Sequence, residues 1–131
     1  MEAATPTSWK TRPLPAQREQ GTFVRQFSAA ELALLQLGLI PQDMDDRWFI
    51  YLADNVLHFH RSWTGCEIFQ LPLTPTTDGG AAATTFWVSR DPAEYRGTSA
   101  EADHDTLTFL IDRLLLDRPA AFSNPAGLAP E

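Results

Sequence analysis

The sequence lacks the features that would tie it to a membrane, an oxidising compartment or a nucleic acid. Its one cysteine, Cys66, has no partner for an internal disulfide, which favours a cytoplasmic protein. No apolar run approaches the roughly 18–20 residues that span a bilayer, and residues 1–8 lack the basic start and apolar stretch of a secretory signal. Ten basic against 17 acidic side chains give a net charge of −7, so the field of the protein repels a polyanion. We therefore expect neither a membrane protein nor a nucleic-acid partner.

The composition fits a single domain with a real core. The chain has 131 residues, of which 44% are hydrophobic, too many for a disordered protein. Residues 1–20 contain three prolines and no hydrophobic periodicity, and residues 119–131 are rich in proline and alanine. Such segments bury too little apolar surface to offset their ordering entropy. We predict one domain over residues 21–118 between two flexible tails.

Capping signals mark two helices on either side of a β-rich region. Ser28 and Glu31 form a capping box, and Gly38 is a typical C-terminal stop. A second capping box, Thr98 with Glu101, precedes the other helix. Between them, dense aromatic and β-branched residues predict strands. The predicted fold is α+β: an antiparallel β-meander of three to four strands, with an N-terminal and a C-terminal helix packed on one face.

Turn residues set the register of the meander. Asp54-Asn55 suits a two-residue hairpin turn, and Gly65 suits the left-handed position of a three-residue loop. Pairing outward from both turns puts Arg61 opposite Glu67 and gives one apolar inner face: Trp48, Ile50, Leu52, Leu57, Phe59, Phe69 and Leu71.

The outer face of the predicted sheet is half apolar. Two helices on the inner side would leave it uncovered, so we expect either a self-association or partner interface there, or packing by the protein's own tail. The residues concerned are Phe49, Tyr51, His58 and His60, with Ile68 and Gln70 beside them.

Metal and nucleophile sites are poorly supported by the sequence. His58 and His60 point the same way along one strand, and Cys66 is predicted on the same face. No CxxC, HExxH or paired-acid motif completes a metal set, and no third residue orients a Cys66–His60 pair. We therefore predict no catalytic residue, no metal and no cofactor. A metal-dependent hydrolase on these three residues is the least favoured hypothesis.

The second hairpin loop concentrates residues that are suited to an anionic ligand. An arginine, an indole and two hydroxyls at one loop tip can hold a nucleotide or a phosphorylated sugar by stacking and charge-assisted hydrogen bonds. The alternative is structural: Arg61 pairs with Glu67 over Trp48, and Arg90 makes a salt bridge at a helix start. The predicted ligand- or partner-binding residues are Trp48, Arg61, Ser62, Trp63, Thr64 and Arg90.

Four short motifs in one order resemble a family of small, uncharacterised bacterial domains. The motifs are Asp46-Arg-Trp-Phe-Ile-Tyr51, His60-Arg-Ser-Trp-Thr-Gly65, Ser89-Arg-Asp-Pro92 with Tyr95, and Leu110-Ile-Asp-Arg-Leu-Leu115. Similar segments occur beside ADP-ribose-processing domains, so the resemblance implies an accessory role in NAD or ADP-ribose metabolism. It brings no catalytic residues, and the long Thr/Gly/Ala connection at 74–83 departs from it.

The sequence thus predicts a small, non-catalytic binding or protein-interaction module. The alternative is a domain that binds or processes ADP-ribose- or NAD-like nucleotides.

Overall fold

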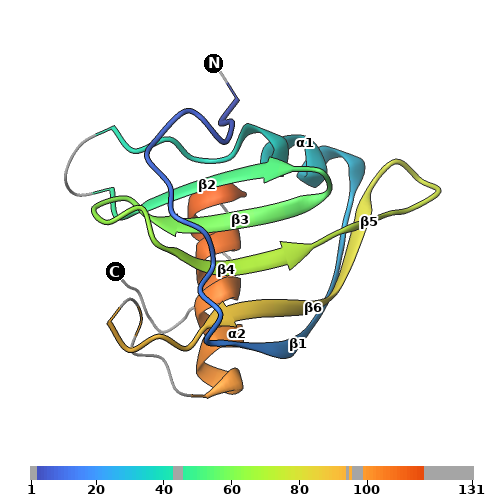
Figure 1. The fold of residues 1–131 in the computed structure, drawn as a ribbon. Helices are drawn as coiled ribbons and strands as arrows, with labels where there is room; N and C mark the ends of the chain where they lie inside the picture. Colours follow the sequence, from blue (N-terminus) through green and yellow to red (C-terminus); the bar gives the residue numbers. More distant parts are fainter. Residues whose placement is uncertain (1–2, 43–45, 94, 96–98, 117–131) are drawn as a thin grey trace.

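The chain folds around one antiparallel sheet of six strands (Figure 1). The computed structural model describes residues 3–42, 46–93, 95 and 99–116. The strand order is β1-β6-β4-β3-β2, with β5 paired to β6. In chain order the elements are β1 (Arg18–Phe27), α1 (Ala29–Leu37), β2 (Trp48–Ala53), β3 (Val56–Arg61), β4 (Glu67–Pro72), β5 (Thr74–Pro75), β6 (Ala81–Ser89), α2 (Ala100–Phe109) and the π-helical η1 (Leu110–Leu115).

The α+β antiparallel class is confirmed, whereas the number of strands and the places of the helices differ from the prediction. A ten-residue strand, β1, precedes the first helix and pairs with β6 at the edge of the sheet. Helix α2 crosses one face of the sheet, while α1 lies at its β2 edge (Figure 1). The capping box of α1 forms as predicted, but α2 is capped by Ser99, whose side chain accepts a hydrogen bond from the Ala102 N–H. Thr98 lies outside the described residues. None of the described helices is long and apolar enough to cross a bilayer.

The first hairpin has the predicted register. Trp48 pairs with Arg61, Ile50 with Phe59 and Leu52 with Leu57. Asp54 and Asn55 have φ values of 54° and 62°, the left-handed conformation that a tight two-residue turn requires. The inner face of this hairpin is therefore the predicted one, and it packs in the main core.

The second hairpin departs from the prediction at a β-bulge. Phe59 pairs with Phe69 as expected, but the register then shifts, and His60 rather than Arg61 lies opposite Glu67. The extra residue of the bulge is Ile68, which is fully buried in the main core instead of lying on the outer face. The predicted Arg61–Glu67 pair is wrong for this reason, since the bulge brings Glu67 to the two histidines.

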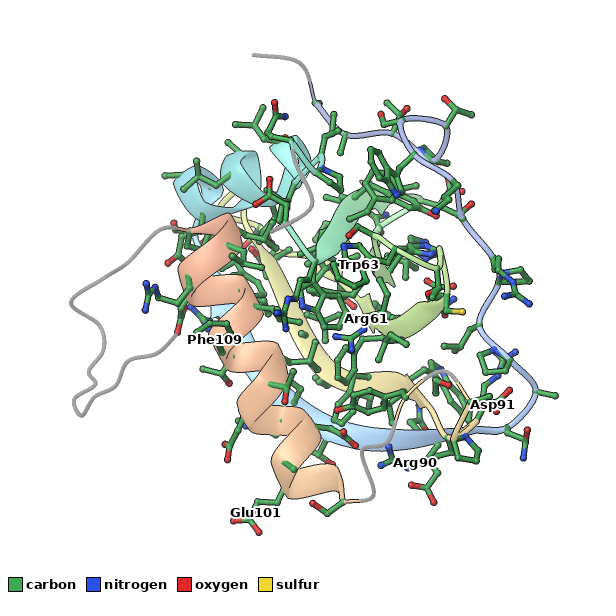
Figure 2. The ribbon with its side chains drawn as sticks, turned by 90° about the vertical axis from the view of Figure 1, so that its left-hand side faces the viewer. Arg61, Trp63, Arg90, Asp91, Glu101 and Phe109 are labelled. Atoms are coloured by element: carbon green, nitrogen blue, oxygen red, sulfur yellow. The ribbon has the colours of Figure 1, made fainter. Side chains whose placement is uncertain are left out.

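The N-terminal segment lies across the outer face, opposite α2 (Figures 1 and 2). The Ala4 N–H donates to Leu37 O, the Arg12 N–H to Gly65 O, and the Trp9 indole N–H to Ser62 O. Residues 3–17, which fall in the tail predicted at 1–20, contact the sheet through these bonds, and residues 18–20 begin β1. The tail predicted at 119–131 lies outside the described residues.

Candidate functional site

At the end of the β3–β4 hairpin, Arg61 closes β3 and pairs with Trp48, the first residue of β2. Trp63 follows in the loop between β3 and β4. The Arg61 guanidinium carbon lies 5.2 Å from the centroid of the Trp48 ring, a cation–π contact. Trp63, two residues further on, is 61% exposed. Figure 2 shows Arg61 and Trp63 on the side of the sheet that carries α2. This hairpin end, defined as Trp48, Arg61 and Trp63, is the candidate ligand-binding surface.

Arg61 has no acidic partner among the described residues. The bulge removes Glu67, its predicted partner, to the outer face. A guanidinium that stacks on an indole with one face still has an N–H edge, and that edge binds phosphate or carboxylate with two parallel hydrogen bonds. The hairpin end therefore offers a positive group with anion-binding geometry in an acidic protein.

The two hydroxyls of the predicted binding set make contacts within the protein. The buried Ser62 Oγ donates to the Asp46 carbonyl at 2.6 Å, and Thr64 Oγ1 accepts from the Cys66 N–H at 3.2 Å. Ser62 therefore fixes the loop from inside. Thr64 is exposed, and its oxygen accepts within the turn while its O–H is not used in that contact.

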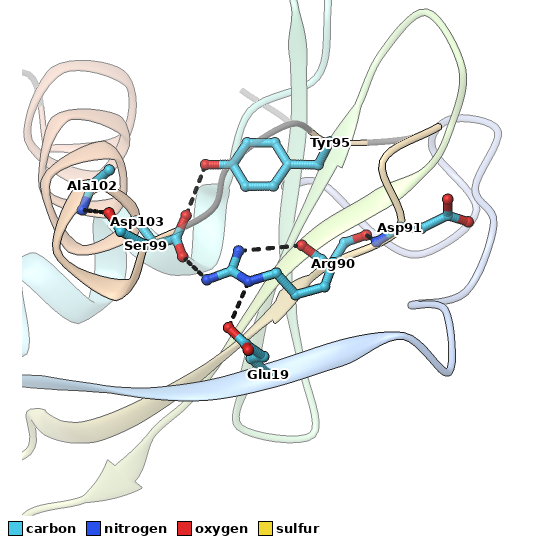
Figure 3. Close-up of polar contacts among 8 residues, drawn as sticks. Glu19, Arg90, Asp91, Tyr95, Ser99, Ala102 and Asp103 are labelled. Carbon is cyan, nitrogen blue, oxygen red and sulfur yellow. Dashed lines mark hydrogen bonds and ion pairs between the residues drawn. The ribbon is translucent and has the colours of Figure 1, made fainter.

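Arg90 belongs to a separate polar network at the start of α2 (Figure 3). Its guanidinium contacts Glu19 Oε1 at 2.6 Å and Asp103 Oδ2 at 2.5 Å, and the Tyr95 hydroxyl donates to Asp103 Oδ1 at 2.9 Å. Figure 2 shows Arg90 well away from Arg61, beside the N-terminal end of α2. The salt bridge of the structural alternative is therefore present at Arg90, which links β1, β6 and α2.

Alkaline unfolding is expected to report this network. Burial, and then the hydrogen bond to Asp103, raise the pKa of Tyr95 from 10.0 to about 12. The stability linked to the protonated phenol is fully present below pH 10 and is lost as the pH rises towards 12, because the unfolded chain ionises first. We expect the free energy of unfolding to fall more steeply over pH 10–12 in the wild type than in Tyr95→Phe. Urea titrations at several pH values measure this free energy. An equal fall over pH 10–12 in the two proteins would contradict the prediction.

A cluster of two histidines and a glutamate, His58, His60 and Glu67, lies on the outer face. His58 Nδ1 lies 2.5 Å from Glu67 Oε2, and His60 Nε2 lies 3.9 Å from the same oxygen. Tyr51 stacks on both imidazoles. The facing ligand atoms of the three residues all lie within 4.8 Å of one another, a spacing suited to a metal ion. Burial is the main cause that lowers the pKa of His60 below its ordinary value.

Cys66 is not part of this His–His–Glu cluster. Its buried thiol packs with the main core and accepts a 3.8 Å contact from Arg12 Nη1. His60 Nδ1 instead donates to the Gly65 carbonyl at 3.0 Å. Within the described residues no hydrogen bond joins Cys66 to His60, so the hypothesis of a cysteine nucleophile with this base has no geometric support. Glu67 takes the place that the sequence assigned to Cys66, and no pattern in the sequence marks the bulge that puts it there.

The outer face is covered by the N-terminal segment. Phe49 and Tyr51 are buried in a small second core with Ala4, against which Trp9 and Ile40 pack. Of the two alternatives for this face, the structure favours packing by the protein's own chain over an open interface.

No family model, curated protein or solved structure matches this chain. The resemblance to bacterial domains found beside ADP-ribose-processing domains therefore stays a prediction.

Proposed function

We propose that the protein is a small binding module without catalytic activity of its own, and that its hairpin end contacts the ligand. The observation that carries the proposal is the Arg61 side chain. It stacks on Trp48 and, among the described residues, has no acidic partner, while Trp63 is exposed two residues away.

The ligand chemistry that fits this surface is an anionic group joined to a flat ring. Phosphate pairs with the N–H edge of a guanidinium, and base–aromatic stacking is worth about 1–3 kcal/mol. ADP-ribose and NAD-like nucleotides carry both groups, so they are the narrower proposal for the ligand. A protein partner would need an acidic side chain next to an aromatic one to use the same contacts.

Calorimetric titration with ADP-ribose, ribose 5-phosphate and adenosine tests the proposal. We expect ADP-ribose to bind best, because only it offers both the phosphates and the ring. Arg61→Ala is expected to weaken its binding by roughly 10- to 100-fold, since a charge-assisted hydrogen-bonded pair is lost.

Arg113→Ala is the matched control. Arg113 is exposed and also stacks on an aromatic ring, with its guanidinium carbon 5.9 Å from the Phe109 centroid, but it lies on η1 and is not part of the hairpin end. It should leave the affinity unchanged. Equal losses in the two variants would contradict the proposed site. Turnover of ADP-ribose that Arg61→Ala abolishes would instead contradict a non-catalytic module and favour a nucleotide-processing domain.

A further inference from the structure

We propose that His58, His60 and Glu67 form a zinc-binding site on the outer face of the sheet. The site is separate from the hairpin end and does not depend on the function proposed for it. Three of its features, a bare buried nitrogen, an outer set of hydrogen bonds and the spacing of the ligand atoms, point to a cation.

The first feature is His60. Its side chain is 2% exposed, and Nε2 has no hydrogen-bond partner within the part of the chain that the structure describes. Because the Gly65 carbonyl can only accept, Nδ1 carries the proton and Nε2 carries a lone pair. That lone pair lies 3.9 Å from Glu67 Oε2, which is another acceptor. Two buried acceptors that face each other are costly unless a positive group lies between them.

The second feature is the set of hydrogen bonds around the ligands. The Gly65 carbonyl holds the far nitrogen of His60, and the Gln70 amide donates to Glu67 Oε1 at 3.0 Å. One polar atom of each buried ligand is thereby held by a hydrogen bond. The other atoms, His60 Nε2 and Glu67 Oε2, lie 3.9 Å from each other within the cluster. Metal-binding histidines and carboxylates usually have such outer partners, which set the tautomer and the ring orientation.

The third feature is spacing. Tetrahedral ligands about 2.0–2.1 Å from zinc lie roughly 3.3 Å apart. Glu67 Oε2 is 3.9 Å from His60 Nε2 and 2.5 Å from His58 Nδ1, and all three ligand atoms lie within 4.8 Å of one another, so changes of up to about 1.5 Å in these spacings reach that geometry. Two imidazoles and one carboxylate are a ligand set of zinc sites that keep a fourth position open. The His58 side chain is 20% exposed, so the site is reached from its side.

Zinc titration of the tag-free, chelator-treated protein tests the proposal. We expect one equivalent to bind and saturating zinc to raise the melting temperature by about 10 °C. His58→Ala and Glu67→Gln should each weaken binding by at least about tenfold. The third histidine of the chain, His104, is half-exposed on α2, and His104→Ala should bind zinc like the wild type.

Circular dichroism of each variant without metal establishes that it is folded. If His58→Ala does not fold, Glu67→Gln still tests the site, because glutamine has the same shape as glutamate. Failure of the wild type to bind zinc would overturn the proposal. It would mean that a proton or a water molecule lies between His60 and Glu67. Equal zinc binding by the wild type and the folded Glu67→Gln variant would also overturn it.

Discussion

Phe69→Ala is expected to lower the free energy of unfolding by about 3–5 kcal/mol, a large part of the stability of a small domain. Phe69 is fully buried at the centre of the inner face, and its ring contacts those of Trp48, Phe59, Phe86 and Tyr95. Truncation removes these contacts and leaves a cavity that rings held by a sheet cannot fill by small shifts.

Phe109→Ala is the control for this experiment, because it deletes the same atoms from a side chain that is 43% exposed on α2. We expect that loss to stay under about 1 kcal/mol. Urea unfolding followed by tryptophan fluorescence measures both. Similar losses for the two variants would contradict the central position of Phe69 in the core.

Asp103→Ala is expected to have an effect of similar size through charge rather than volume. Asp103 is fully buried and accepts from both Arg90 and Tyr95. Its removal leaves a largely buried guanidinium and a phenol without that acceptor, and breaking a buried pair from one side costs about 3–5 kcal/mol.

The other carboxylate on Arg90 is the matched control. The Glu19 side chain is 63% exposed, so water screens its ion pair with the same guanidinium. Glu19→Ala should therefore cost less than about 1 kcal/mol. Thermal melts of the two variants compare the stability that each substitution removes. An equal loss of stability in Glu19→Ala and Asp103→Ala would show that Arg90 is not anchored through α2.

The inner face was predictable from the sequence because two constraints agree there. A left-handed Asp54-Asn55 turn sets the register of the first hairpin, the alternation of apolar residues with histidines along β3 agrees with it, and the structure has that register. The second hairpin obeys the same rule as far as Phe59 and Phe69. A bulge at Ile68 then moves every residue before it by one position, and an apolar residue placed there suits either face.

The pairing of β1 with β6 at the edge of the sheet escaped prediction for a different reason. Strand β1 buries only Phe23 and Phe27 of its ten residues, so its sequence indicates no more than a short strand over Thr22 to Phe27. Its partner β6 begins at Ala81, in a stretch of alanines with little strand propensity. Pairing between these distant segments stabilises both, and local patterns carry no sign of it. The His–His–Glu cluster depends on the bulge at Ile68, and no local pattern in the sequence marks that bulge either.

The central claim, that the hairpin end binds an anionic ligand with a flat ring, is tested most directly by NMR of the indole N–H groups. The chain has four tryptophans, and Trp48 and Trp63 belong to the hairpin end, whereas Trp87 lies on β6. On titration with ADP-ribose we expect the Trp48 and Trp63 signals to shift together and the Trp87 signal to stay in place. Unchanged signals from Trp48 and Trp63 at saturating concentrations of the nucleotide would contradict the claim.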